Sequence, residues 1–417
     1  MISRSLLLLL IVTAGCKKEF KIEITDLNLY TQNSECPDLI LSPQDKLYHT
    51  WIEREGDSLD VLKYAILEQY GWSKPHEIVN GTDWFVNWAD FPTLAVFAGS
   101  ELNLLASYLQ KNPRGKTYDY DIKLASSNSN GERFRLIDSL HSTIPGEHGF
   151  VSMQSFSYNK NLIVWLDGSQ MNGEGGDTSS DHHDHGGSMQ LMAAFVDING
   201  RITDRTVLDD MTCECCQTDI AMTPKGPVVV YRNKGTDHVR DIYLTRYNAG
   251  KWSTPRAIHQ DNWVIHGCPV NGPAISSLGN KVAVVWYTAV QDNPSIYFSI
   301  SENAADSFSN PIKLNTKFTD GRLDIGWLSK DILAISYLDK LEKKADRAQI
   351  HITLFDGAGT TIADHIITET SSKRKSGFPV MQNSKDTLYL SYTQVDHDHR
   401  TVVKSKKITF PELKIPN

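Results

Sequence analysis

The sequence predicts an all-β protein, a β-propeller of seven four-stranded blades. Three observations lead to this prediction. An apolar run rich in β-branched and aromatic residues recurs seven times, at intervals of roughly 50 to 65 residues. A short strand pattern precedes each copy and another follows it, with polar turns between them. No stretch of useful length has the apolar spacing of a helix. Radial repetition of such units builds propellers, and six blades with one extra element is the alternative.

The recurring run is the predicted second strand of each blade, and it often ends in Trp or Tyr. Its seven copies span residues 46–51, 102–108, 162–165, 228–231, 282–287, 332–337 and 388–392. The predicted innermost strands span residues 38–41, 93–97, 151–156, 219–222, 274–277, 323–327 and 378–381. The predicted third strands span residues 61–67, 119–125, 190–196, 241–247, 295–299, 349–355 and 401–406. The last unit lacks a fourth strand, and residues 20–29 are expected to supply it and close the ring.

The N-terminus has the pattern of a secretory signal. Arg4 precedes an apolar run at 6–12, which is too short to span a bilayer because a spanning helix needs about 20 residues. The following Thr13-Ala14-Gly15-Cys16 resembles the lipobox of bacterial lipoproteins, which implies lipidation of Cys16 and a membrane anchor. We therefore expect a signal peptide over 1–16, a tether and ring-closing strand over 17–35, and one propeller domain over 36–417. The expected location is the outer membrane, facing the periplasm or the cell surface.

Composition narrows the class of partner. The 417 residues carry a formal net charge of −8, with both signs well mixed, whereas a nucleic-acid-binding protein needs a basic stripe. Of the six cysteines, Cys16 is assigned to the lipid. The five others are expected in an oxidising compartment, where disulfides persist. An odd number leaves at least one of them unpaired or used otherwise.

The turn at Ser301–Phe308, SENAADSF, resembles the Asp box (S-x-D-x-G-x-x-W) of sialidases and related propellers. Asn303 stands at the Asp position, Ala305 at the Gly position and Phe308 at the Trp position. Residues 248–253 and 70–73 are partial copies. The resemblance implies a sialidase-like propeller fold. These boxes are folding motifs at blade edges, so they imply no activity.

Four cysteines occupy two loops that precede innermost strands. Cys213, Cys215 and Cys216 form a C-x-C-C cluster, and Cys268 follows His266 by two residues in the next blade. In a propeller, the loops entering the innermost strands share one face with the loops that join second and third strands. Thiolates favour Cu(I) or Zn(II), and imidazole suits both metals. In an extended segment Cys216 would point away from the other two, so a shared ion requires a bend. A disulfide staple between the blades and a redox thiol are the alternatives.

Further histidines are expected on the same face. His148 lies in one entering loop, and a long loop contains His182, His183 and His185. Short tracts rich in histidine bind metals, and a solvated polar loop is the alternative. If the cysteines and histidines act together, copper or zinc is the expected cofactor.

The resemblance to sialidases raises a second chemistry. That family uses three arginines against the substrate carboxylate, a tyrosine nucleophile with a glutamate, and an aspartate acid/base, and its first arginine sits in an F-R-I-P motif that this chain lacks. Arg232, Arg240 and Arg322 fall on the expected face as substrate contacts. Asp90, Glu147 and Asp320 are the carboxylates there that suit acid/base work.

The sequence thus favours a membrane-anchored propeller that binds a ligand or a soft metal through its Cys/His cluster. A sialidase-type hydrolase that acts on a glycan is the alternative, and a scaffold for a protein ligand is the third possibility. No oligomeric state is implied.

Overall fold

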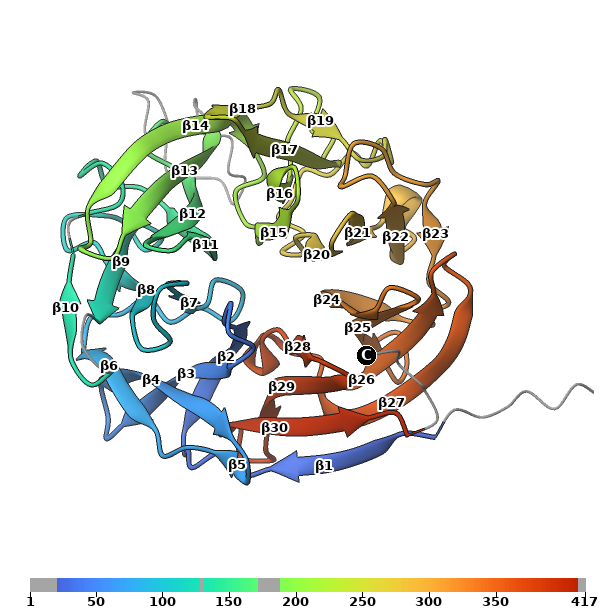
Figure 1. Cartoon of the computed structure of the whole chain (residues 1–417), viewed down its shortest axis with the longest axis horizontal. Helices are drawn as coiled ribbons and strands as arrows, with labels where there is room; N and C mark the ends of the chain where they lie inside the picture. Colours follow the sequence, from blue (N-terminus) through green and yellow to red (C-terminus); the bar gives the residue numbers. More distant parts are fainter. Residues whose placement is uncertain (1–20, 128–130, 138, 172–187, 412–417) are drawn as a thin grey trace, which may run out of the picture.

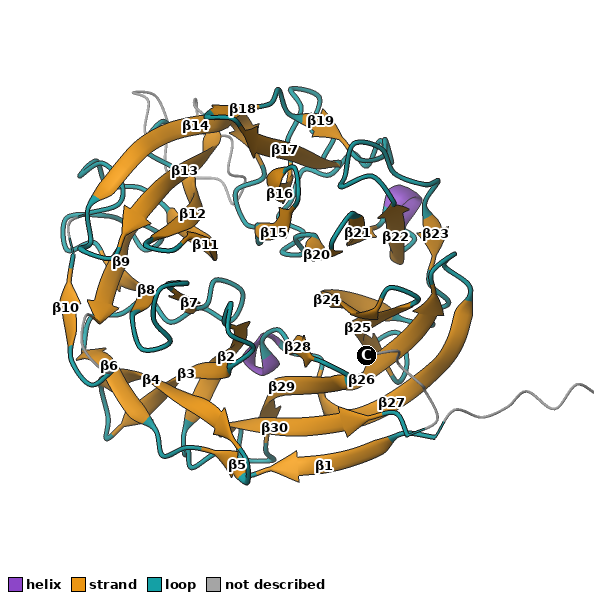
Figure 2. Cartoon of the chain, in the orientation of Figure 1, coloured by secondary structure: helices purple, strands orange, loops and turns teal. Residues whose placement is uncertain are grey.

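The computed structural model describes residues 21–127, 131–137, 139–171 and 188–411. Seven antiparallel sheets form a ring around a central axis, and loops join their strands (Figures 1 and 2). The predicted seven-bladed propeller is therefore confirmed, and six blades with an extra element is wrong. Two short 3-10 helices, Val290–Asp292 and Arg374–Ser376, are the helical segments of the described part of the chain.

The first three blades follow in chain order, each from the channel outward. Blade 1 contains β2 (Ser34–Leu41), β3 (Leu47–Glu55) and β4 (Leu59–Glu68), with β5 (Gly71–Trp72) and β6 (His76–Gly81) both paired to β4. Blade 2 contains β7 (Thr93–Val96), β8 (Leu104–Lys111), β9 (Tyr120–Ser127) and β10 (Phe134–Leu136). Blade 3 contains β11 (His148–Ser157), β12 (Lys160–Asp167), β13 (Met189–Asp197) and β14 (Ile202–Thr212).

The next three blades repeat this arrangement. Blade 4 contains β15 (Asp219–Thr223), β16 (Gly226–Arg232) and β17 (Ile242–Asn248), with β18 (Lys251–Trp252) and β19 (Arg256–Ala257) paired to β17. Blade 5 contains β20 (Ala274–Leu278), β21 (Lys281–Thr288), β22 (Ser295–Ser301) and β23 (Ile312–Lys313). Blade 6 contains β24 (Thr319–Ser329), β25 (Ile332–Lys340), β26 (Arg347–Asp356) and β27 (Thr361–Ser371).

Blade 7 joins the two ends of the chain. Its inner strands are β28 (Val380–Ser384), β29 (Thr387–Val395) and β30 (Thr401–Thr409). The N-terminal strand β1 (Glu23–Leu27) pairs antiparallel with β30, and Figure 1 shows it at the outer edge of this blade. The predicted ring closure is thus confirmed, and it removes the open edge that β30 would otherwise present. β2 begins at Ser34, two residues before the expected start of the propeller.

Half-buried aspartates on innermost strands join neighbouring blades. Asp219 accepts the backbone N–H of Ile275 in the next blade at 2.8 Å, and Asp324 accepts that of Met381 at 2.6 Å. Burial raises the pKa of Asp219 to about 7 and that of Asp324 to about 8. These carboxyl groups satisfy N–H groups that face across the blade junctions, so they hold the ring together from inside.

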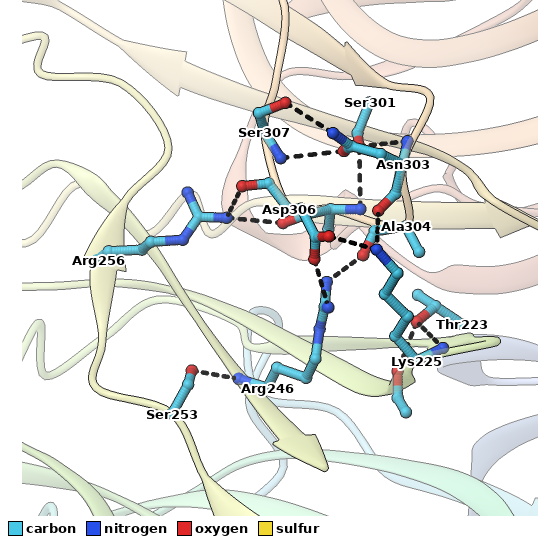
Figure 3. Close-up of polar contacts among 12 residues, drawn as sticks. Thr223, Lys225, Arg246, Ser253, Arg256, Ser301, Asn303, Ala304, Asp306 and Ser307 are labelled. Carbon is cyan, nitrogen blue, oxygen red and sulfur yellow. Dashed lines mark hydrogen bonds and ion pairs between the residues drawn. The ribbon is translucent and has the colours of Figure 1, made fainter.

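The Asp-box turn has the local geometry that its residues imply (Figure 3). The Ser301 hydroxyl donates to Asn303 Oδ1 at 2.8 Å and accepts the Ala305 N–H at 2.9 Å, while Asn303 Oδ1 accepts the Ser307 N–H at 3.0 Å. Ala305 has φ = +64°, a left-handed conformation that explains the usual glycine at this position. Asn303 therefore replaces the usual aspartate without loss of the turn.

Candidate functional site

The three cysteines of the C-x-C-C cluster converge at the end of β14. A turn at residues 214–215 supplies the bend that an extended segment lacks. Cys213 Sγ lies 3.4 Å from Cys216 Sγ and 3.9 Å from Cys215 Sγ, and all three sulfurs lie within 4.8 Å of one another. The predicted cluster thus forms a compact set of three soft donors, which we call the thiol triad.

The triad is buried in an apolar setting. Cys213 is 1% exposed, Cys216 2% and Cys215 9%, and all three pack in one core cluster with residues such as Phe150 and Leu191. The Cys213 N–H donates to the Arg232 carbonyl at 3.0 Å, which ties the loop to blade 4. Main-chain pairing and core packing therefore fix the positions of the thiols before any ligand arrives.

Arg240 provides the charge that balances this site. Its Nη1 lies 2.9 Å from Cys213 Sγ and 2.9 Å from a Glu214 carboxylate oxygen, and Lys234 forms an ion pair with the other Glu214 oxygen. Burial opposes ionisation of Cys213, but hydrogen bonds from Cys215 and Cys216 and the Arg240 charge lower the pKa of Cys213 well below its usual value. Burial and the neighbouring Cys213 raise the pKa of both Cys215 and Cys216. The surroundings therefore favour a thiolate at Cys213 over one at Cys215 or Cys216.

Cys268 approaches the triad from the loop that enters blade 5. It is exposed and stands outside the compact set of three. Two residues earlier, the exposed His266 packs its ring against His238, with centroids 4.3 Å apart. The loop that contains Cys268 contacts the loop of the triad, because the Gly272 N–H donates to Gln217 Oε1 at 2.9 Å. Within the described residues, none of the five cysteines forms a disulfide.

The structure places His148 in a different group. Its Nδ1 lies 3.2 Å from the Tyr120 carbonyl, and its Nε2 lies 3.1 Å from the Ser169 hydroxyl. Its ring stacks on that of His141 at 3.8 Å, and the two histidines form a possible ligand set with Asp121. Both ring nitrogens of His148 have hydrogen-bond partners within this group. His148 is therefore not part of the thiol triad. Its assignment as a metal ligand stays a prediction.

Two of the three predicted carboxylates contact the hydroxyl group of the same tyrosine. The Tyr120 hydroxyl lies 3.1 Å from Asp90 Oδ2 and 3.0 Å from Glu147 Oε1. One hydroxyl proton cannot serve both oxygens, so one carboxyl group must carry a second proton. Consistent with this, burial raises the pKa of Asp90 to about 7 and that of Glu147 to about 8. The third carboxylate, Asp320, forms an ion pair with Lys340 at 2.6 Å.

The predicted arginines bond within the chain. Arg232 donates to the carbonyls of Asn271, Arg240 and Tyr287 at 2.7–3.2 Å. Arg322 donates to the Ser376 hydroxyl at 2.7 Å and to the carbonyls of Ser372, Lys373 and Gly377 at 2.9–3.3 Å. Arg232 is 2% exposed, Arg240 4% and Arg322 5%. These guanidinium groups hold loops in place, and their role as substrate contacts stays a prediction.

Some predicted residues lie outside the described part of the chain. They are Cys16, His182, His183 and His185. Just before the histidine tract, Met171 packs against the core cluster that contains the thiol triad. Among the described residues there is no helix that combines the length and the apolar character needed to span a bilayer.

Sequence reasoning missed four residues of this region. Glu214 and Lys234 form part of the charge balance, His238 pairs with His266, and Tyr120 joins the two carboxyl groups. Glu214 stands inside the C-x-C-C motif, so its position was an available signal. The other three come from separate loops and strands, and their residue types are too common for the sequence to single them out.

Comparisons with known proteins show likeness in fold at low identity. The GH93 α-L-arabinofuranosidase of Fusarium graminearum in complex with arabinobiose matches with a TM-score of 0.46 and 10% identity, covering 94% of this chain and 98% of that chain. The NanB sialidase from Streptococcus pneumoniae matches with a TM-score of 0.45 and 11% identity, covering 95% of this chain and 71% of that chain. The intramolecular trans-sialidase from Ruminococcus gnavus matches with a TM-score of 0.47 and 12% identity, covering 92% and 96%.

Neither a known family model nor a curated protein matches the chain. The blade topology and the Asp-box turn, both visible in this chain itself, decide the fold. The fold is that of a sialidase-like β-propeller. Such folds support many unrelated functions, so the function must come from the residues of the site.

Proposed function

We propose that this propeller binds a soft metal ion, with Cu(I) favoured, through Cys213, Cys215 and Cys216. The observation that supports the proposal is the convergence of three buried thiols within 4.8 Å of one another. Thiolates select Cu(I) and Zn(II) among the metals available to proteins. Structural Zn(II) sites are almost always four-coordinate, whereas this compact set offers three donors, and the difference favours Cu(I).

The surroundings of the triad suit a bound cation with anionic ligands. Metal binding requires deprotonated thiols, and Cys213 already has a lowered pKa because of hydrogen bonds and the Arg240 charge, despite burial. The Arg240 guanidinium can balance part of the negative charge that three thiolates would bring to one ion. The sulfurs are buried against an apolar core, which limits the access of water to a bound ion.

The proposed location is extracytoplasmic, with the protein anchored to the outer membrane through lipid on Cys16. The N-terminal sequence pattern supports this part of the proposal. Export also explains why a thiol site would be guarded by burial, because exposed thiols oxidise readily in such compartments. Labelling with a fatty-acid analogue tests the anchor, and Cys16→Ser should abolish the label.

The decisive experiment measures metal and thiols on the same protein. The purified protein is reduced, loaded anaerobically with Cu(I) or Zn(II), desalted and analysed for bound metal. We expect one Cu(I) per chain, with the triad protected from thiol reagents. Cys213→Ser and Cys216→Ser should lose the metal, and Cys36→Ser should keep it. Cys36 is a matched control, because it is buried in blade 1 and its thiol donates to the Asn87 carbonyl at 3.4 Å.

The alternative outcomes separate the other uses of the cysteines. A chain that binds no metal and has disulfides within the cluster would make the cysteines a structural staple. A chain that binds no metal and has reactive thiols would favour a redox role. Bound metal should also stabilise the fold, by about 2.7 kcal/mol at 100 times the dissociation constant. An unchanged melting temperature on loading would count against the triad as the binding site.

A hydrolase remains the second candidate because of the Asp90–Tyr120–Glu147 group. A carboxyl group protonated near neutral pH can act as a general acid in glycoside hydrolysis, and Glu147 is partly accessible while Tyr120 is fully buried. This candidate predicts turnover of a sialoside or related glycoside that Glu147→Gln abolishes. The rate should fall as the pH rises through about 8, the raised pKa of Glu147. A scaffold for a protein ligand would show neither metal nor turnover.

A further inference from the structure

A cavity of about 190 Å³ lies against blade 3. Its lining combines apolar side chains, among them Leu140, Ile144 and Met192, with the hydroxyl-bearing residues Ser142 and Ser169. This volume is smaller than the roughly 300–1,000 Å³ of pockets that hold drug-sized ligands, so the cavity suits a small, apolar group. No residue of the thiol triad lines it, so chemistry at this cavity is separate from the proposed metal site.

Ser169 contacts a histidine at this cavity. Its Oγ lies 3.1 Å from His148 Nε2. His148 Nδ1 lies 3.2 Å from the Tyr120 carbonyl oxygen, which can only accept, so Nδ1 carries the proton of the neutral ring. Nε2 then presents its lone pair to the Ser169 hydroxyl. A hydroxyl within about 2.6–3.2 Å of a base that a third group orients is the arrangement of an activated nucleophile.

Two neighbours hold this base in place. Asp167 Oδ1 accepts the Ser169 N–H at 3.0 Å, and the same oxygen lies 3.5 Å from His148 Nε2. Burial alone would raise the pKa of Asp167, but its contacts with His148 and Ser169 lower that pKa below its usual value. The Asp167 carboxylate can therefore stabilise the imidazolium that forms when Nε2 takes a proton. The His141 ring stacks on the His148 ring at 3.8 Å and fixes its plane.

We propose that Ser169 and His148 form a hydrolytic site for carboxylic esters with a short, apolar acyl group. Ser169 is half-buried and lines the cavity, so its hydroxyl can meet a substrate there. The Ser142 hydroxyl lies 2.8 Å from Ser169 Oγ and provides a donor for the negative charge that develops on the ester carbonyl oxygen. The inference goes beyond the proposed soft-metal site, and it gives His148 a role other than the predicted metal ligand.

The reaction balances without a redox partner. Ser169 Oγ bonds to the ester carbonyl carbon as its proton passes to His148 Nε2. The bond from that carbon to the alcohol oxygen then breaks, and the leaving oxygen takes the proton from Nε2. A water molecule attacks the acyl-serine in the same way, with its proton passing through Nε2 to Ser169 Oγ. The products are one alcohol and one carboxylic acid.

The test uses the full chain with a fluorophosphonate probe and with p-nitrophenyl acetate. We expect one label per chain, located on Ser169 by peptide mass spectrometry, and release of p-nitrophenol. Ser169→Ala should lose the label and the ester hydrolysis, and His148→Gln should lower the rate by about 10²–10⁴. Ser100→Ala should match wild type. Ser100 is a matched control, because it is half-buried and its hydroxyl accepts the Leu102 N–H at 3.4 Å.

Melting temperatures are measured for every variant, so that loss of activity is separated from loss of fold. His148 is fully buried, and Ser169→Ala at its half-buried position is therefore the decisive variant. Labelling of another residue in place of Ser169, such as Cys213, would overturn the inference. Hydrolysis by Ser169→Ala at the wild-type rate would overturn it as well. A wild-type chain that takes no label and releases no p-nitrophenol would also overturn it, and the soft-metal proposal would be unaffected.

Discussion

Blade 4 carries a charged cluster at each of its two ends, and the two clusters differ in their exposure to water. At the cysteine end, Arg240 contacts Cys213 and Glu214, and the side chains of Arg240 and Glu214 are only 4% and 9% exposed. At the Asp-box end, Arg246 and Lys225 contact Asp306, whose side chain is 45% exposed (Figure 3). Similar partners therefore act in two different dielectric environments.

The comparison shows that the number of ion pairs says little about how much they contribute to the free energy of folding. An exposed pair gains little because water and salt screen the attraction. A buried charge has lost its hydration and depends on its partner, so removal of one partner leaves a large cost. Between the two ends, Asp219 of blade 4 accepts the N–H groups of Ile220 and, in blade 5, of Ile275.

The largest expected effect is at Arg240. Arg240→Met should destabilise the fold by about 3–5 kcal/mol, because it leaves the buried Glu214 and Cys213 without their shared cation. The pKa of Cys213 should rise at the same time, which a thiol-reactivity profile against pH will show. Urea unfolding measures the stability change, with Arg240→Lys as the variant that keeps the charge. A loss below about 1 kcal/mol would show that water reaches this end of blade 4 as well.

A smaller loss is expected at Asp219, which lies in the innermost strand of blade 4. Asp219→Ala removes the acceptor of two backbone N–H groups and should cost about 1–3 kcal/mol in unfolding free energy. The exposed Asp57 provides the control, and Asp57→Ala should change stability by less than about 0.5 kcal/mol. Equal effects of the two substitutions would mean that Asp219 does not act as a clamp between the blades.

The pH dependence of stability tests the aspartates that join neighbouring blades. Burial raises the pKa of Asp219 to about 7 and that of Asp324 to about 8, from 3.8 in the unfolded chain. At a pH between 3.8 and the raised pKa, the folded state keeps a proton that the unfolded state has released. The stabilisation that results is therefore complete below about pH 4 and falls as the pH rises toward 8. Each such group lowers stability by up to about 1.4 kcal/mol per pH unit in that window.

The lowered pKa of Cys213 acts in the opposite direction, so the comparison must be made between variants. The measurement is the melting temperature from pH 4 to 9 for wild type, Asp219→Asn and Asp324→Asn. Both variants should decline less steeply than wild type as the pH rises. A slope identical to that of wild type would mean that these carboxyl groups are ionised in the folded protein.

The smallest effect is expected at the Asp-box end. Asp306→Ala should cost less than about 1 kcal/mol, because its ion pairs are exposed. The difference from wild type should shrink further in about 1 M NaCl, where screening acts over only about 3 Å. A salt-independent loss above about 2 kcal/mol would show that this end is as well shielded as the cysteine end.

The fold could be predicted from the sequence because its signals are local and repeated. Each blade carries the same alternation of strand runs and polar turns, and seven weak signals at one spacing support one another. The ring closure by β1 followed from a simple count, since the last blade lacked a strand. The Asp-box turn was recognisable despite its substitutions because Ser301 and Asn303 keep the hydrogen-bonding atoms that the turn requires.

The candidate site could be located but not built from the sequence. The rule that loops at one end of each blade share a face placed Cys268 near the C-x-C-C cluster. The bend that gathers Cys213, Cys215 and Cys216, the contact with Arg240 and the separation of His148 depend on how loops from blades 2 to 5 pack together. Spacing along a chain fixes which face a residue occupies, whereas distances between side chains are decided by tertiary packing. Chemistry depends on those distances, so the sequence determined the architecture and the tertiary structure decided the site.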